Sequence, residues 1–327
     1  MSKIDELNSK ILKDLLYDGR KGFTQIAKEC GVTKNKIWKR YKAMEKKGII
    51  TGATIQINFA RLGYDALATL LINVEAQLIT EAMEYIGKVA EVRVSRQYNS
   101  VYNIRAVATL SDLNELDQVK QAIKRKLPVM GLKTYIWTDV RNIPENLNFT
   151  RNTKKANGNS EPCSKAIVNT KIDRIDIDDI DRQIMEKLTL DGRASFTEIA
   201  KEIGTATDTI VKRYHKLKKN GAIKVSIQIN PNKIGYNSIL DFSIAFTSSG
   251  NLSNTVIESL AKIPDVIIIT KTSGDYDLQL TAMVKDTQQA FAIQDEIAKI
   301  SQATKMEVSA RKIPDKWPAP RQHISTY

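Results

Sequence analysis

Two basic stretches of this 327-residue sequence carry residue types at spacings that suit contact with a polyanion. The polar side chains of the first stretch are Lys34, Asn35, Lys36, Lys39 and Arg40. Between them, apolar side chains recur at helical spacing at Ile37, Trp38, Tyr41 and Met44. A helix with that apolar stripe turns its polar side chains away from the core. Lysine and arginine donate to phosphate oxygens, and arginine and asparagine also read base edges, so the pattern indicates contact with nucleic acid.

The second stretch repeats the first with changes that alter its chemistry. Its candidate contact residues are Thr207, Asp208, Thr209, Lys212 and Arg213, of which the last two preserve the earlier lysine and arginine. Hydroxyl and carboxylate groups can accept from cytosine or contact thymine methyl groups, but they cannot make the phosphate or guanine contacts of lysine. We therefore expect the two stretches to prefer different half-sites, or one of them to bind mostly without sequence preference.

The net charge of +13 is concentrated around these stretches. Residues 1–50 hold 13 basic and 6 acidic side chains and residues 205–224 hold 6 and 1, whereas residues 51–150 hold 11 and 10. A solvated helix with cations at its C-terminal end would explain Lys46 and Lys47, because the helix dipole favours them there. It does not explain Lys34 and Lys36 in the first turn, where a helix in the major groove meets base edges.

An internal duplication supplies the elements that must position these residues. Residues 18–50 match residues 191–223 at 17 of 33 positions, and the match continues from IQIN at 55–58 to IQIN at 227–230. In each copy, apolar periodicity predicts three helices, with a short glycine-containing turn between the second and third, followed by a β-branched run that forms a hairpin or wing. The second helix is expected over 24–30 and 197–203. This order is a helix-turn-helix.

The remainder of each copy alternates strands and helices. In the second copy the pattern predicts strands over 238–246, 266–272, 276–284 and 305–312, with helices over 253–261 and 287–300, and the first copy has the same order from 66 to 141. The order βαββαβ is the ferredoxin-like unit, a four-stranded antiparallel sheet with helices on one face. The other face must be covered, so we expect the two units of one chain to pair as a pseudo-dimer. Exchange between chains is the alternative, and whole chains can assemble further.

The predicted fold class is α+β, as a tandem repeat of a helix-turn-helix (winged-helix) domain and a ferredoxin-like domain. The expected domains are 1–58 and 173–230 for the helix-turn-helix units and 59–144 and 231–314 for the ferredoxin-like units, with a linker over 145–172 and a tail over 315–327.

Composition limits the classes of protein that remain. Two cysteines, Cys30 and Cys163, cannot build a disulfide framework, and no cluster of cysteine and histidine offers a zinc site, so we expect no metal and no cofactor. Cys30 and Trp38 are expected to be core residues. The apolar runs are too short to span a membrane, and a reducing cytoplasm is the expected compartment.

The sequence resembles the Lrp/AsnC (feast/famine) transcription regulators. The resemblance rests on DGR, FTEIAKEIG, KRYHKLKKNGAI, IGY and TSGDYDLQL, in the order that this family uses, and it covers nearly the whole chain as two complete copies. It implies a sequence-specific DNA-binding transcription regulator that acts on double-stranded DNA and often responds to an amino acid or another small effector.

The resemblance also implies an effector site in the second copy, at Gly274, Asp275, Tyr276 and Asp277. Glycine permits an open backbone whose N–H groups donate to a carboxylate, and aspartate accepts from an ammonium group. A simple hairpin turn is the alternative explanation of this segment. The first copy has Ser100, Val101, Tyr102 and Asn103 here, and we expect it to have lost the ligand.

Two other functions fit the same architecture. Tetrapyrrole decarboxylases of the siroheme type use histidine and arginine in the ferredoxin-like module, where Arg93, Arg96 and Arg105 could meet a carboxylate-rich substrate. The two histidines, His215 and His323, lie outside the sequence of that module, so we expect the chain not to be an enzyme. An architectural DNA-coating protein would share the DNA-binding helices but lack a ligand response.

Overall fold

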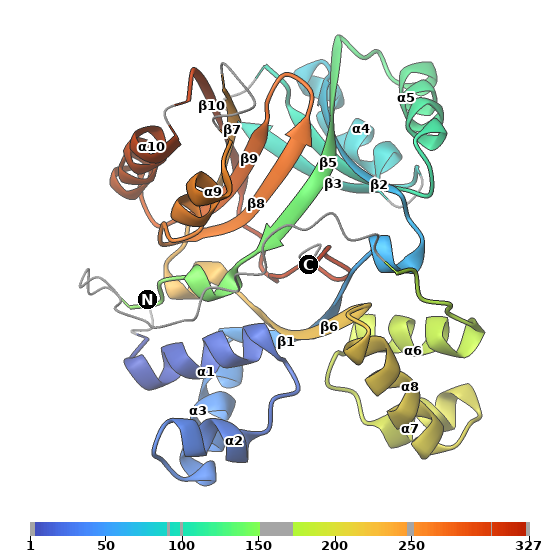
Figure 1. Ribbon diagram of the computed structural model, residues 1–327, viewed down its shortest axis with the longest axis vertical. Helices are drawn as coiled ribbons and strands as arrows, with labels where there is room; N and C mark the ends of the chain where they lie inside the picture. The colour runs from blue at the N-terminus through green and yellow to red at the C-terminus, as the bar shows by residue number, and fades with distance from the viewer. Residues whose placement is uncertain are drawn as a thin grey trace.

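The chain folds into two three-helix heads, a two-stranded ribbon and an eight-stranded barrel (Figure 1). The computed structural model describes residues 4–89, 92–98, 101–150, 173–246, 252–301 and 303–324. The α-helices are α1 (Glu6–Tyr17), α2 (Phe23–Glu29), α3 (Lys34–Lys46), α4 (Ile79–Ile86), α5 (Asn114–Lys126), α6 (Asp179–Leu190), α7 (Phe196–Ile203), α8 (Thr207–Lys219), α9 (Asn254–Leu260) and α10 (Thr287–Ser301). The strands are β1 (Ile50–Ile57), β2 (Ala66–Asn73), β3 (Val92–Tyr98), β4 (Ile104–Leu110), β5 (Gly131–Asn142), β6 (Ile223–Ile229), β7 (Ser238–Ala245), β8 (Val266–Ser273), β9 (Leu278–Val284) and β10 (Lys305–Lys312). Short 3-10 turns cover Ala60–Leu62, Ala76–Leu78, Pro144–Asn146 and Pro231–Ile234.

The elements predicted from periodicity agree with these bounds to within two residues at each end in the second copy. The first head consists of α1 to α3 and the second head of α6 to α8. Both heads begin with a side-chain N-cap, because Asp5 accepts from the backbone N–H of Asn8 and Asp178 accepts from that of Asp181. In the second head Asp178 and Asp181 form a complete capping box, a role that the spacing of Ser195 and Glu198 also suggests but that Ser195 performs only as a single cap.

The strand that follows each head pairs with its copy rather than folding back as a local hairpin. β1 and β6 form an antiparallel ribbon in which Ile57 lies opposite Ile223. Each strand of the ribbon also contributes side chains to the core of the other repeat's head. Ile227 and Ile229 of β6 pack in the core of the first head, while Ile55 and Ile57 of β1 pack in the core of the second. Neither head is therefore complete without the strand of the other repeat.

The two ferredoxin-like sheets join edge to edge within the chain. Each has the strand order expected for βαββαβ, and β5 pairs antiparallel with β8 while β10 pairs with β3, so that the strand order β10-β3-β4-β2-β5-β8-β9-β7 closes on itself. The helices α4 and α5 cover the outside of one half and α9 and α10 the outside of the other (Figure 1). The faces that the sequence leaves uncovered consequently point into the barrel.

Two segments that were expected to be linker or tail are packed in the core, so the expected boundaries differ from the structure here. Leu147 and Phe149 are buried, and the Asn146 side chain donates to the backbone carbonyl of Val266 at 3.1 Å. The C-terminal segment, defined here as residues 313–324, crosses the ribbon, with Trp317 bridging to Ile229 of β6. Both segments carry apolar side chains, and packing them in this core removes their surface from water. The rest of the expected linker, residues 151–172, lies outside the described residues.

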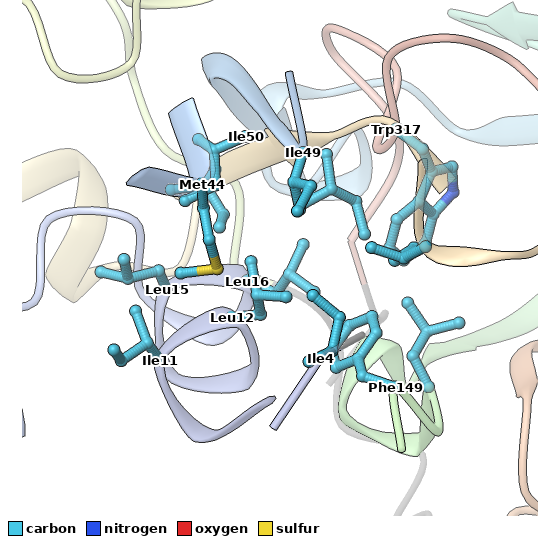
Figure 2. Packing of buried hydrophobic residues seen from close by; sticks show 14 of the residues in the cluster. Ile4, Ile11, Leu12, Leu15, Leu16, Met44, Ile49, Ile50, Phe149 and Trp317 are labelled. Atoms are coloured by element: carbon cyan, nitrogen blue, oxygen red, sulfur yellow. The ribbon is translucent and has the colours of Figure 1, made fainter. Parts of the chain in front are cut away.

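Figure 2 shows how far this core reaches beyond the helices of the first head. Leu12 and Leu15 of α1 and Met44 of α3 pack with Ile49 and Ile50 at the beginning of the ribbon. Phe149 and Trp317 complete the cluster, although they follow the last strand of each repeat. Truncating one such buried leucine to alanine typically costs about 2–5 kcal/mol. The first head is thus fixed to the rest of the molecule by continuous apolar packing.

Candidate nucleic-acid interface

The beginning of α3 presents the predicted contact residues to solvent. The hydroxyl of Thr33 caps the helix by accepting from the backbone N–H of Lys36 at 3.3 Å. Ile37, Tyr41 and Met44 are buried against the head's core, which fixes the rotation of the helix. The side chains that this rotation leaves exposed are Lys34, Asn35, Lys36 and Lys39.

Three of these exposed side chains, Asn35, Lys36 and Lys39, border a shallow hollow of about 410 Å³ that Thr33 and Arg40 also line. Among the described residues, Lys34, Lys36 and Lys39 have no carboxylate within 4.0 Å. Their charges are therefore not neutralised by short ion pairs. Lys36 acts on Asp5 only at longer range: burial raises the pKa of Asp5, but the Asn8 backbone, Arg40 and, least, the charge of Lys36 together hold it below its ordinary value. A helix end that exposes cations and an amide in this way suits phosphate and base contacts.

Arg40 and Arg213 each form an ion pair within their own head, a contact that the sequence did not predict, and their contact with DNA stays a prediction. Arg40 donates to the Asp5 carboxylate at the N-cap of α1. Arg213 donates to Asp178 at 2.6 Å and lies 3.1 Å from Asp181. The backbone N–H of Asp181 and the guanidinium of Arg213 hold the pKa of Asp178 below its ordinary value. These arginines join the last helix of each head to the first.

The beginning of α8 differs from that of α3 in both charge and exposure. Asp208 and Lys212 are exposed, whereas Thr207 and Thr209 are half-buried. Ala206 stands at the N-cap and offers no side-chain acceptor. Over the whole unit, residues 173–230 hold 11 basic and 10 acidic side chains, whereas residues 1–58 hold 13 and 6. The first head is strongly basic and the second is nearly neutral.

The Asp-Gly-Arg turns that precede α2 and α7 join the two heads, a role that sequence reasoning missed. The Arg20 guanidinium donates to the backbone carbonyls of Gly192 at 2.8 Å and Ala194 at 2.7 Å, and it lies 4.2 Å from the ring centroid of Phe196. Arg193 reciprocates by donating to the carbonyl of Gly19 at 2.7 Å. The signal was present in the sequence, because DGR is identical in both copies.

The glycines of these turns are required by close packing on the ribbon. A Cβ at Gly19 would lie 2.9 Å from the backbone carbon of Ser226 in β6, and a Cβ at Gly192 would lie 2.8 Å from the backbone nitrogen of Thr54 in β1. Both are closer than real Cβ contacts, and backbone atoms cannot move aside cheaply. Glycine therefore lets each turn touch the opposite strand.

Trp38 is exposed, contrary to the expectation that it is a core residue. Its side chain is 48% exposed and borders a second hollow, of about 440 Å³, between the two heads. Leu190 and Arg193 from the second head also line this hollow. The helical stripe of the first head is narrower than the sequence suggested, since it consists of Ile37, Tyr41 and Met44. Cys30 packs partly against the same core, as expected.

The predicted effector segment lies at the seam between the two ferredoxin-like modules. Asp275 forms an ion pair of 2.8 Å with Lys133 of the first module, and this contact holds the pKa of Asp275 below its ordinary value. Gly274 has a φ of +148°, and a Cβ there would lie 2.9 Å from the Tyr135 ring. Tyr276 is buried. Gly274 and Asp275 are exposed and Asp277 is half-buried, so Gly274 and Asp275 are the most accessible members of the set.

Asp277 has a local structural contact that its counterpart also makes. Its carboxylate accepts from the backbone N–H of Phe246 at 2.9 Å, directly after β7. In the first copy the Asn103 side chain accepts from the backbone N–H of Val74 at 3.2 Å and donates to the carbonyl of the same residue at 2.6 Å. Each side chain satisfies a backbone group at a strand end. Asparagine in place of aspartate at position 103 therefore keeps this structural contact but removes the charge.

A layer of charged residues lies inside the barrel. The outward-facing residues of β4 and β7 pack under the helices, so their neighbours Arg105 and Asp241 point inward. Arg311 donates to Asp241 at 3.0 Å, and Thr281 donates to it at 2.7 Å. Burial lowers the pKa of Arg105 to about 10, while burial raises that of Asp241 but Arg311 and Arg105 outweigh it. Arg105 and Arg311 therefore face the inside of the barrel, and the sequence did not predict this placement.

The structure brings His323 to the base of this barrel, although the residue lies outside the module in sequence. Its ring stacks on Phe59 with centroids 5.8 Å apart, and its Nδ1 accepts from the backbone N–H of Phe59 at 3.4 Å. Burial and, secondarily, the charge of Arg93 lower the pKa of His323 to about 3. His215, by contrast, is exposed on α8. His323 is thus distant from the ferredoxin-like modules in the sequence but lies next to the barrel in the structure.

Two negative findings apply to the part of the chain that the structure describes. No helix there is long and apolar enough to cross a membrane. No group of three or more histidine, cysteine, aspartate and glutamate side chains is arranged to hold a metal ion among those residues.

Comparison with known proteins bears on the fold and the family. A solved structure of the siroheme decarboxylase NirDL matches 98% of this chain and 93% of its own, with a TM-score of 0.62 and 14% sequence identity. At that identity the likeness shows the fold alone, which is the complete tandem arrangement of heads and sheets.

The sequence relatives are transcription regulators. The AsnC-type helix-turn-helix domain model matches residues 177–218, and the winged helix-turn-helix DNA-binding model matches residues 4–51. The HTH-type transcriptional regulator FL11 of Pyrococcus horikoshii is 35% identical over 128 residues, which cover 39% of this chain and 83% of the relative. The regulator LrpA of the same organism is 34% identical over 116 residues, covering 36% and 82%. The chain therefore belongs to the Lrp/AsnC family of transcription regulators, with two units of that family in tandem.

Proposed function

We propose that this protein is a sequence-specific transcription regulator in which a single chain supplies both DNA-binding heads. The observation that carries the proposal is the exposed first turn of α3, where Asn35 and Lys36 line a hollow and Lys34 and Lys36 have no short ion pair among the described residues. The ribbon supports it as well, because it ties the two heads into one unit as a dimer would. The heads would then meet two half-sites on one face of a duplex, about one helical turn or a multiple apart.

The salt dependence of duplex binding tests this proposal. With about 6–10 neutralised phosphates for two engaged heads, log K should fall with log salt at a slope of about −5 to −9. Lys39→Ala should weaken binding, while Lys120→Ala on the outer helix α5 should not. Salt-independent binding, or an equal effect of both variants, would contradict the proposal.

A response to an amino acid is the finer part of the proposal. The open backbone at Gly274 and the exposed carboxylate of Asp275, which also pairs with Lys133, are the groups that a zwitterion could reach, while Tyr276 is buried and Asp277 accepts from the backbone of Phe246. Melting curves with each of the common amino acids would reveal a stabilising ligand. Absence of any shift at millimolar concentration would remove the effector from the proposal.

Assembly of whole chains through their outer surfaces is also proposed, with the two modules of one chain serving as a pseudo-dimer. Tethering within a chain gives effective concentrations in the millimolar range, which favours pairing within the chain over exchange. Crosslinking between cysteines placed on the two modules, in a mixture of differently tagged chains, distinguishes pairing within a chain from exchange between chains. Products that join differently tagged chains at low concentration would support exchange.

A tetrapyrrole decarboxylase is the second candidate, and the barrel interior is the observation that favours it. Inward-facing Arg105 and Arg311 could meet substrate carboxylates, and His323 lies near Arg93 at the base. The fold likeness to NirDL agrees with this candidate without identifying a substrate. Incubation with siroheme under reducing, oxygen-free conditions distinguishes the two. Carbon dioxide release with a changed absorption spectrum would favour the enzyme, and an unchanged pigment would favour the regulator.

An architectural DNA-coating protein would use the same DNA-binding heads but would bind DNA without a preferred sequence. Footprints that spread along DNA without a preferred sequence would favour coating. A footprint confined to two half-sites would favour regulation.

A further inference from the structure

The two Asp-Gly-Arg turns are joined to the opposite heads unequally. Asp18, in the first turn, forms an ion pair of 2.8 Å with Lys218 near the end of α8. The position equivalent to Lys218 in α3 is Glu45, and the position equivalent to Asp18 is Asp191. Glu45 and Asp191 both line the hollow between the heads. One turn is therefore held by opposite charges, whereas both equivalent side chains on the other side are acidic and Glu45 pairs with Lys42 of its own helix at 2.7 Å.

The arginines of the turns show the same inequality. Arg20 donates to two carbonyls and stacks 4.2 Å from the ring centroid of Phe196. Arg193 donates to the single carbonyl of Gly19, lies 5.1 Å from the ring centroid of Phe23, and borders the hollow. Planar, hydrogen-bonded stacking of a guanidinium is geometrically specific. The Arg20 side is closed and the Arg193 side is open.

These contacts lie where the relative position of α3 and α8 is decided. Each turn leads directly into the helix-turn-helix of its own head, and its arginine reaches the equivalent turn of the other head. One base-pair step of B-DNA advances roughly 3.4 Å along the axis, so a small change in the separation of the helices alters which half-site spacing fits.

We propose that the paired turns form an unequal clasp that fixes the separation of the recognition helices and thereby sets which half-site spacing the protein accepts. Arg20, Asp18 and Lys218 form the tight side, and Arg193 forms the loose side. Arg20 and Arg193 are positioning residues that need not touch DNA. The spacing part of this inference rests on the proposed DNA-binding function, whereas the separation of the helices does not.

Spin-label distances test the clasp without DNA. Labels at Lys46→Cys and Lys219→Cys, the exposed last residues of α3 and α8, report the separation when Cys30 and Cys163 are replaced by serine. We expect a narrow distance distribution in the full chain. Arg20→Ala should broaden it most, Arg193→Ala less, and Arg125→Ala on the exposed end of α5 not at all.

A variant that should narrow the distance distribution shows that the broadening in the alanine variants is not caused by loss of folding. Glu45→Lys places on the loose side the residue that its counterpart α8 carries, opposite Asp191, and should narrow the distribution. Arg20→Lys keeps the charge but loses the planar fork, so it should give an intermediate width. Equal widths in all folded variants would overturn the clasp.

Half-site spacing is the second readout. Duplexes that differ by one base pair in the spacing of their half-sites measure the spacing preference, which is the ratio of affinities at the best and the neighbouring spacing. Arg20→Ala should lower this ratio about tenfold, because heads that are held less tightly to each other distribute their effective concentration over more relative positions. Glu45→Lys should sharpen that preference. A loss of affinity that is equal at every spacing would indicate a merely structural role and reject the spacing part. If the unaltered chain binds no duplex, the proposed function fails, and the label distances still decide the clasp.

Discussion

The first and second heads share a fold and a set of internal contacts but differ at the surface that faces a ligand. Tyr41 and Tyr214 are buried at equivalent positions, and Arg40 and Arg213 reach equivalent N-cap carboxylates. The first turn of α3 carries two lysines, whereas that of α8 carries two threonines and an aspartate. The duplication has therefore kept the residues that build a head and changed those that would read DNA.

The largest expected effect comes from exchanging these first turns. Replacing Lys34, Asn35 and Lys36 by threonine, aspartate and threonine should weaken binding by about 2–4 kcal/mol and reduce the magnitude of the salt slope by about 2, because two phosphate-reaching cations are lost. Fluorescence anisotropy over a range of salt concentrations measures both quantities. The reverse exchange at residues 207–209 is the matched control and should strengthen binding. Equal binding by all three proteins would show that the first turns do not contact DNA.

The next effect concerns the C-terminal segment, which sits on the ribbon that joins the heads. The pKa of His323 is about 3 in the folded chain and near 6.5 when unfolded, so the unfolded state binds the extra proton as the pH falls. Stability should thus decline between about pH 6.5 and pH 3, by about 2 kcal/mol at pH 5 from this group.

Melting temperatures from pH 7 to pH 4 measure this loss. His323→Gln should lower stability at neutral pH but flatten its dependence on pH, whereas His215→Gln, on the exposed face of α8, should leave the stability at neutral pH unchanged. An undiminished pH dependence in His323→Gln would contradict the burial of a neutral imidazole.

A smaller difference is expected between Arg40 and Arg213. Arg213 serves Asp178 and the buried Asp181, while Arg40 serves the exposed Asp5. Arg213→Ala should cost about 1–3 kcal/mol of unfolding free energy because it leaves a buried carboxylate without its partner, and Arg40→Ala should cost less than about 1 kcal/mol. Urea unfolding measures both. A larger cost for Arg40→Ala would reverse the comparison.

The smallest effect concerns the effector segments of the two repeats. If an amino acid binds at Asp275, it should stabilise the chain by about 1.4 kcal/mol at ten times its Kd. Asp275→Ala should remove that stabilisation, and Val101→Ala at the equivalent position of the first copy should not. Thermal melting with and without the amino acid provides the measurement, and an equal loss in both variants would contradict a site confined to the second copy.

Local pattern was sufficient to predict most elements of this chain. Apolar periodicity located the helices and strands, since packing of α3 on Ile37 and Met44 follows from spacing alone. Alternation and element order gave both ferredoxin-like units. The exposed cations of α3 were also predictable, because they lie opposite the apolar stripe.

Non-local pairing set the limit of what the sequence could predict. The pairing of β1 with β6 joins residues more than 160 positions apart, and nothing in a β-branched run distinguishes that partner from a local hairpin. The positions of Trp317 and His323 could not be predicted either, because both residues lie in the expected tail and are bridged to strands of the ribbon, which forms only through non-local pairing. The ion pair of Arg40 with Asp5 could not be predicted either, because a basic residue on a helix face does not indicate that a carboxylate lies at the N-cap of another helix.

Selection of bound duplexes from a random pool tests most directly the claim that one chain reads two unlike half-sites. The full chain should enrich a motif with two different halves at one constant spacing, and the variant with the first turn of α3 exchanged should lose the preference for one half while keeping the other. A palindromic motif, or simultaneous loss of both halves in that variant, would contradict the account.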